Sequence, residues 1–148
     1  MKFLFLYGLA IMIGALIPVQ AATNATLSKI TGHVFYSSLI LFVVGIILVL
    51  ALIILFRPIP PSIEELMTAP LHSFAGGIIV ATYVLSITYL APRIGIGNAV
   101  FLIVTGQILS AAIIDHYGLF GSNIFPFTFK KIAGLSFMIV GLIIINNS

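Results

Sequence analysis

Residues 34–56 read VFYSSLILFVVGIILVLALIILF, a long run without a single charged side chain. A bilayer has a hydrocarbon core of about 30 Å, which a helix of about 20 apolar residues crosses. Arg57 and Pro58 follow the run, where a cation can extend to the membrane surface and a proline cannot prolong the helix. The pattern therefore predicts a transmembrane helix over 34–56.

The composition of the whole chain agrees with a membrane protein. Hydrophobic residues make up 61% of the 148 residues and charged residues 6%, with a mean hydropathy of +1.32. A water-soluble domain carries about 25% charged residues, so a soluble fold is excluded. The six Lys and Arg form no basic stripe, which excludes nucleic acid as a partner. Cysteine is absent, so the chain has no disulfide or thiolate chemistry.

Further apolar runs on both sides of 34–56 predict an all-α fold, a polytopic bundle of five transmembrane helices in a single membrane domain over 1–148. The expected spans are 3–22, 34–56, 71–90, 97–114 and 130–145. Pro92 is expected to break the third. Between the second and third spans, Ser62 and Glu65 have capping-box spacing, which predicts one short helical turn at the membrane surface.

The first apolar run has two interpretations. Lys2, the run from Phe3 to Ile17 and the small residue Ala21 have the layout of a secretory signal peptide. The apolar register continues through Ala22, however, and further spans follow directly. We therefore expect an uncleaved first helix.

Charge distribution bears on orientation. With an odd number of spans the two termini lie on opposite faces, and the cations divide four to two between the faces. One face carries Lys2, Arg57, Lys130 and Lys131, and the other carries Lys29 and Arg93. The positive-inside rule favours a cytoplasmic N-terminus, but the small difference leaves insertion in both orientations open.

Polar residues inside spans either join helices or line an aqueous path, because hydrocarbon offers them no partner. Gln20 and Asn24 lie four residues apart, on one face of a helix, just after Pro18. Pro18 lacks an N–H and so leaves the carbonyl of Gly14 available. The two amides are candidate substrate ligands, and hydrogen bonding to neighbouring helices is the alternative.

Two further candidates lie in the third and fourth spans. Gln107 is near the middle of the fourth, beside Gly106 and Ser110, whose small side chains let another helix approach. Tyr83 could supply a hydroxyl to the same interior, as could Thr82, Ser86 and Thr88, although such residues are ordinary in membrane helices. Gln107 and Tyr83 are interpreted as substrate-binding residues, with helix packing as the alternative for Gln107.

Titratable residues offer one adjacent pair, Asp115 and His116, which could relay protons or balance the charge of a cationic substrate. The alternative is a wetted helix end with local ion pairing. Arg93 is expected on the face opposite Asp115, and an inverted second copy would bring the two to one face. We expect no metal site, no cofactor and no enzymatic activity, because the chain shows no catalytic triad, no paired catalytic carboxylates and no nucleotide loop.

Motifs spread along nearly the whole chain carry a family resemblance. In order they are Pro18-x-Gln20 with Asn24, Gly76-Gly77, Pro92-Arg93-x-Gly95, Gly106-Gln107 and Asp115-His116-x-Gly118-Leu119. In this order they resemble the YdcZ-like proteins of the drug/metabolite transporter superfamily. The resemblance implies a bacterial inner-membrane protein of five helices, equivalent to half of a ten-helix transporter, with two units assembled in inverted orientation. It also argues against cleavage after Ala21.

Together these observations predict a secondary transporter, an exporter of a small molecule or metabolite. It would act as an antiparallel dimer, with itself or with a paralogue, by alternating access to a cavity at the repeat interface. Membrane lipids and the small-molecule substrate are its other expected partners. The alternative is a non-transporting membrane subunit that scaffolds or regulates a partner complex, in which the same polar residues only join helices.

Overall fold

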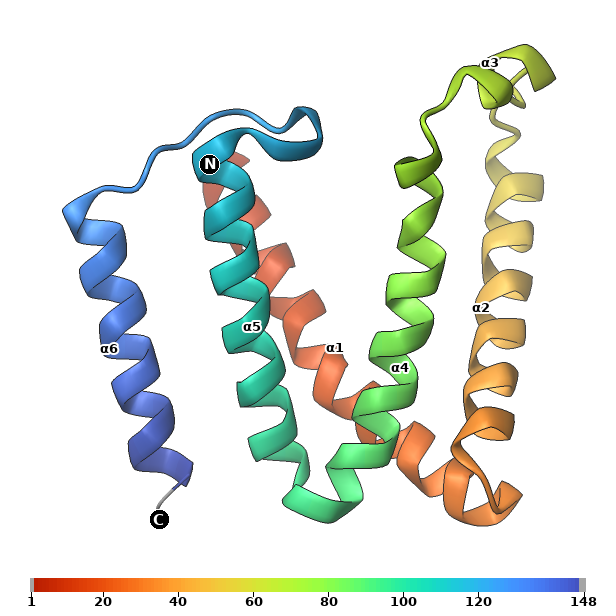
Figure 1. Cartoon of the computed structure of the whole chain (residues 1–148). Helices are drawn as coiled ribbons and strands as arrows, with labels where there is room; N and C mark the ends of the chain where they lie inside the picture. The colour runs from red at the N-terminus through yellow and green to blue at the C-terminus, as the bar shows by residue number, and fades with distance from the viewer. Residues whose placement is uncertain (1, 147–148) are drawn as a thin grey trace. The chain divides into compact units, whose positions relative to one another are not determined.

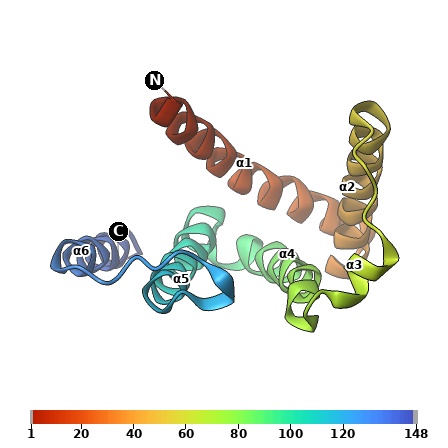
Figure 2. The same ribbon diagram turned by 90° about the horizontal axis from the view of Figure 1, so that it is seen from above.

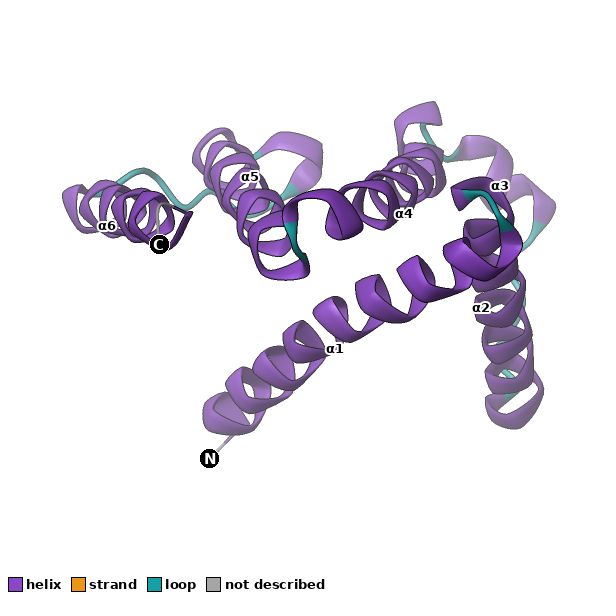
Figure 3. Cartoon of the chain, turned by 90° about the horizontal axis from the view of Figure 1, so that it is seen from below, coloured by secondary structure: helices purple, strands orange, loops and turns teal. Residues whose placement is uncertain are grey.

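A computed structural model of the chain describes residues 2–146, and all regular secondary structure within them is helical (Figures 1 and 3). This confirms the expected all-α class. The described chain divides into two compact units, one ending at Arg93 and the other beginning at Ile94. Each unit is described by itself below.

The first unit contains three long helices and two short ones. They are α1 (Lys2–Thr31), α2 (Val34–Phe56), α3 (Ile63–Thr68), the 3-10 helix η1 (Leu71–Phe74) and α4 (Ala75–Ile94, whose last residue falls in the second unit). Gly32, with φ of 78°, separates α1 from α2. The end of α1 lies beside the first turns of α2 (Figure 2).

The first two long helices differ in how well the sequence predicts their ends. The helix α2 has the expected bounds and is capped at both ends. The Nδ1 atom of His33 accepts a hydrogen bond from the Phe35 N–H at 3.2 Å, and Arg57 ends the helix in the left-handed conformation with φ of 47°. In contrast, α1 continues to Thr31, beyond the expected span 3–22, and contains Pro18. The extra turns bring Asn24 and Lys29 onto a helix rather than a loop.

The capping box predicted between the second and third spans is confirmed at α3. The Ser62 hydroxyl accepts from the Glu65 N–H at 3.2 Å, and the Glu65 carboxylate accepts from the Ser62 N–H at 2.8 Å. These contacts with the Ser62 N–H and hydroxyl hold the pKa of Glu65 below its usual value. Because the folded-state pKa is lowered, the cap stabilises α3 above the usual carboxyl pKa and is lost as pH falls through the lowered one.

One expectation about the third long helix is wrong. Pro92 does not break α4, which continues through it to Ile94. The proline lies in the last turn of α4, where its missing N–H costs the helix a single hydrogen bond. Little of the helix follows the proline, so a kink there has little effect. A single residue, Gly95 with φ of 86°, then precedes the next helix.

The second unit contains α5 (Ile96–Tyr117), the short 3-10 helix η2 (Leu119–Gly121) and α6 (Phe129–Asn146). The connector between α5 and α6 is folded back on the end of α5. The Phe125 N–H donates to the Asp115 carbonyl at 2.8 Å, and the Phe127 N–H donates to Nδ1 of His116 at 3.0 Å. Gly118, with φ of 61°, ends α5 and allows this reversal.

Replacing Gly118 with alanine is expected to destabilise the protein more than the same change at Gly121. Both glycines have positive φ, 61° and 78°, a conformation that costs an L-residue about 1 to 2 kcal/mol. Only at Gly118 would the new Cβ meet other atoms, at 2.8 Å from Ile124 Cγ1. This overlap should add about 1 to 3 kcal/mol. Equilibrium unfolding in mixed micelles measures the difference, and equal losses for the two variants would contradict the packing of this connector.

Among the described residues, four helices are long and apolar enough to cross a membrane: Leu4–Thr31, Val34–Phe56, Leu71–Ile94 and Ile96–Tyr117. The fifth expected span, 130–145, is helical as part of α6 but is not among these four. A multi-pass membrane protein is therefore supported. The count of five spans and the single domain over 1–148 stay predictions.

Candidate functional site

The first unit has a small polar cluster where α1, α2 and α4 meet. Asn24, Ser38 and Thr88 come from these three helices and are 3%, 2% and 1% exposed. The Asn24 side-chain NH₂ donates to the Thr88 hydroxyl at 2.6 Å and lies 3.5 Å from the Ser38 hydroxyl. Buried amides and hydroxyls of this kind join helices in the membrane.

Small buried side chains of α1 and α4 surround this cluster. On α1, Ala21 and Ala25 flank Asn24 and are buried with it, and on α4 the buried residues include Ala91. Alanine in place of a larger residue allows two helix backbones to come close enough for short side chains to hydrogen-bond. The polar cluster is therefore enclosed by small apolar side chains.

The Asn24–Thr88 bond yields a stability prediction with a matched control. Thr88 and Thr82 each donate a hydroxyl hydrogen bond to the carbonyl four residues earlier, at 2.7 and 2.9 Å, but only Thr88 also accepts from Asn24. Thr88→Val should therefore lose about 1 kcal/mol more than Thr82→Val. Unfolding in mixed micelles tests this. In the Asn24→Leu background the difference should vanish, and its persistence there would contradict the assignment.

Three buried polar atoms of the first unit have no hydrogen-bond partner among the described residues: Gln20 Nε2, Asn24 Oδ1 and Tyr83 Oη. Turning an amide by 180° would exchange its ends and still leave one end unpaired. Within a membrane no bulk water replaces the missing partner, and each unsatisfied group is costly. Such atoms call for a partner outside the described chain, such as a ligand, a trapped water or another subunit.

Two of the three residues, Gln20 and Asn24, line one groove, here called the amide groove, between α1 and α2. Its volume is about 410 Å³. It is lined by Leu16, Val19, Gln20, Thr23, Asn24, Leu27, Ile40, Leu41 and Val44. The Thr23 hydroxyl is satisfied within its own helix, at 3.0 Å from the Val19 carbonyl. The two amides therefore line the same apolar groove, and their role as substrate ligands stays a prediction.

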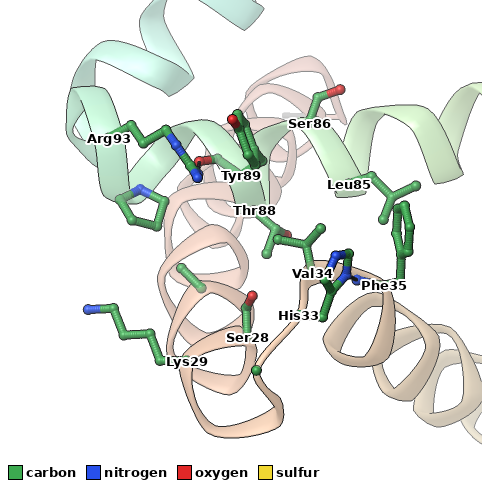
Figure 4. A pocket seen from close by; sticks show the side chains of 13 residues that line it. Ser28, Lys29, His33, Val34, Phe35, Leu85, Ser86, Thr88, Tyr89 and Arg93 are labelled. Atoms are coloured by element: carbon green, nitrogen blue, oxygen red, sulfur yellow. Dashed lines mark hydrogen bonds between the residues drawn. The ribbon is translucent and has the colours of Figure 1, made fainter.

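A second hollow, here called the cationic hollow, lies between the end of α1, the start of α2 and the end of α4 (Figure 4). Its volume is about 620 Å³, and Lys29, Arg93, His33, Tyr89, Ser28 and Ser86 are among its lining residues. Thr88 lines this hollow and Asn24 lines the amide groove. The hydrogen bond thus joins a residue of one space to a residue of the other.

Arg93 is held firmly at the edge of the cationic hollow. Its Nη1 donates to the Tyr89 carbonyl at 2.6 Å, and its guanidinium lies 3.4 Å from the centre of the Tyr89 ring. This cation–π contact orients the group. The interpretation of Arg93 as part of a charge relay with Asp115 stays a prediction.

The other predicted site residues lie in the second unit. Gln107 is exposed on α5 and forms no hydrogen bond with the described residues. Asp115 is half-buried and, with Lys131, lines a hollow of about 330 Å³ between α5 and α6. His116 accepts from the Phe127 N–H, so its Nδ1 is used to hold the connector. Lys131 donates to the Phe125 carbonyl at 3.2 Å.

Sequence reasoning gave no site role to two contributors to the first unit, Ser38 in the buried cluster and Lys29 in the cationic hollow, and gave little weight to Thr88. Serine and threonine are common in membrane helices, so a hydroxyl alone gave no signal. A usable signal was the alanine spacing around Asn24, which marks the face of α1 that another helix can approach.

Comparison with known proteins gives one match. A family model described as "Putative inner membrane exporter, YdcZ" matches residues 5–144, which is nearly the whole chain. No curated protein and no solved structure matches. The match confirms the resemblance drawn from the motifs and, with the apolar helices, a multi-pass location in the inner membrane.

Proposed function

Since the chain belongs to the YdcZ family of inner membrane exporters, we propose that it exports a small molecule through the amide groove by alternating access, as an antiparallel dimer. The observation that carries this proposal is that Gln20 and Asn24, each with a buried and unpartnered amide atom (Nε2 and Oδ1), line the same apolar groove. One is a donor and the other an acceptor. A substrate with a polar group can satisfy both.

The size and chemistry of the amide groove support a small substrate. Ligand sites are typically apolar clefts of about 300 to 1,000 Å³ with a few placed polar groups, and the groove falls in this range at about 410 Å³. Its lining residues include no titratable side chain. We therefore propose that Gln20 and Asn24 recognise an uncharged polar part of the substrate.

The bond between Asn24 and Thr88 supports a gating role. It joins Asn24, which lines the amide groove, to Thr88, which lines the cationic hollow, and the two residues come from α1 and α4. When Asn24 turns toward a substrate, Thr88 keeps its own bond to the Val84 carbonyl at 2.7 Å and is not left unpaired. Opening therefore costs the bond from Asn24 to Thr88 and the longer one to Ser38, and hydrogen bonds to the substrate offset this cost.

Two features of the described chain support assembly with an inverted second copy. Most large apolar side chains of α2 from Leu39 to Phe56 are exposed, so lipid or another subunit must cover them. Gln107 lies within the expected fourth span and lacks a partner in its own unit. In an inverted dimer, Gln107 and Tyr83 would complete the substrate-binding set of Gln20 and Asn24. The titratable residues would form a charge relay: Asp115, His116 and Arg93.

The competing proposal is a non-transporting scaffold or regulatory subunit. The Asn24–Thr88 bond favours the scaffold proposal, because this contact joins two helices even if nothing is transported. The scaffold proposal does not account for the unpaired atoms of Gln20 and Asn24, which a purely structural amide would leave as a cost.

Efflux from liposomes tests the export function. Purified protein is reconstituted into vesicles loaded with the small-molecule fraction of a bacterial cytosol, and mass spectrometry follows which compounds appear outside. A defined compound, or a set sharing one chemical group, should leave faster than from protein-free vesicles. If every compound leaves at the protein-free rate, export fails and the scaffold is favoured.

A further inference from the structure

We propose that the cationic hollow is an anion-binding site, which takes a carboxylate or phosphate group. Its ligand is the charged end of the exported compound, and this identification rests on the export function proposed above. The compound would then be a small organic anion with an uncharged polar part for the amide groove.

The charged residues around the hollow are the first observation that supports an anion site. Both cations of the lining, Lys29 and Arg93, extend from the ends of α1 and α4 on the same side of the hollow (Figure 4), and the lining contains no carboxylate. In residues 2–93 the only acids are Glu64 and Glu65, in α3 beyond the far end of α2. The 23 residues of α2 form a helix about 35 Å long, so neither carboxylate neutralises the hollow.

Hydrogen-bond donors without a partner among the described residues are the second observation. Lys29 forms no hydrogen bond or ion pair with the described residues, and Arg93 commits only Nη1, to the Tyr89 carbonyl. The hydroxyls of Ser28 and Ser86 also line the hollow and donate to no described residue. An ammonium, a guanidinium and two hydroxyls around about 620 Å³ are the donor types that bind carboxylate and phosphate groups.

A purely structural account explains less. A cation in the last turn of a helix stabilises the helix dipole, and Lys29 and Arg93 occupy such positions. That account treats the two residues separately and gives no reason for both to border one hollow with free hydroxyls. Arg93, although exposed, is also oriented by its contacts with Tyr89, four residues earlier in the same helix.

Anion binding can be measured directly on the full chain. The protein is placed in phosphatidylcholine nanodiscs, and succinate and inorganic phosphate are titrated by calorimetry at constant ionic strength in chloride. At least one anion should bind. Lys29→Gln should weaken this binding by about tenfold or more, because a charged hydrogen bond is lost. Lys29 has no hydrogen bond or ion pair with the described residues to lose, so its variant remains informative if Arg93→Gln fails to fold.

Lys130→Gln is the matched control, because it removes the same charge from residue 130, outside the hollow. Its affinity should equal that of the unmodified protein. Equal weakening in both variants, or no binding of either anion, would overturn the site.

The lipid source is distinguished by repeating the titration in phosphatidylglycerol nanodiscs. Unchanged affinity supports a dissolved ligand. Suppressed binding supports the anion site but assigns it to a lipid headgroup, which overturns the substrate identification. Binding is measured without transport, so a protein that binds anions and exports nothing refutes export alone. One that exports and binds no anion refutes the anion site alone.

Discussion

Replacing Gln20 with leucine should lower efflux by about tenfold or more while leaving the folded protein as stable as before. The Gln20 Nε2 atom is buried and unpartnered, so leucine removes an unsatisfied group and breaks no hydrogen bond of that atom. A transported compound loses a donor that binds it, and one hydrogen bond of about 1.4 kcal/mol corresponds to a tenfold change. Efflux from proteoliposomes and unfolding in mixed micelles measure the two quantities on the same samples.

Thr23→Val is the matched control for this experiment. Thr23 lines the same groove three residues away, and its hydroxyl already donates within α1, to the Val19 and Gln20 carbonyls. Efflux should be close to that of the unmodified protein. The opposite pattern for Gln20→Leu, normal efflux with a loss of stability, would show that the amide joins helices and does not bind substrate.

The sequence predicted the helices best where local chemistry determines them. The run 34–56 has no charge and ends at Arg57 and Pro58, and α2 has these bounds. Ser62 and Glu65 form the capping box because its two bonds depend on a spacing of three residues. At Pro92 the same local reasoning failed, because a proline in the last turn of a helix is tolerated and the sequence alone does not say which turn is last.

The sequence predicted which residues of the candidate site share a helix face, but not which other helix that face contacts. A spacing of four residues places Gln20 and Asn24 on one face of α1, and the structure gives both to one groove. Helical periodicity does not say which other helix this face meets. The partner of Asn24 is Thr88, 64 positions away in the chain, and nothing in the sequence around Thr88 distinguishes it from Thr82. Long-range contacts of this kind can be identified only from the three-dimensional structure.

Labelling of a single cysteine from outside the cell should reach only about half of the molecules if the chain inserts in both orientations. The expected four-to-two division of cations gives a weak orientation bias, and an antiparallel homodimer requires both orientations. The chain contains no cysteine, so Glu64→Cys introduces a unique thiol. Glu64 is exposed in the connector before α4 and lies outside the capping contacts of Ser62 and Glu65. An impermeant maleimide applied to intact cells, and then to permeabilised cells, gives the accessible fraction.

Gly97→Cys provides the complementary measurement, because the candidate span Leu71–Ile94 lies between the two positions in the chain. Gly97 is exposed in the first turn of α5, and an added Cβ meets nothing within 4 Å. If α4 crosses the membrane, the fraction labelled at one position should be the fraction protected at the other, whatever the orientation bias. Complementary fractions near one half support the inverted homodimer. Complete labelling at one position and none at the other would mean a fixed orientation, so that an inverted partner for Gln107 could come only from an oppositely oriented paralogue.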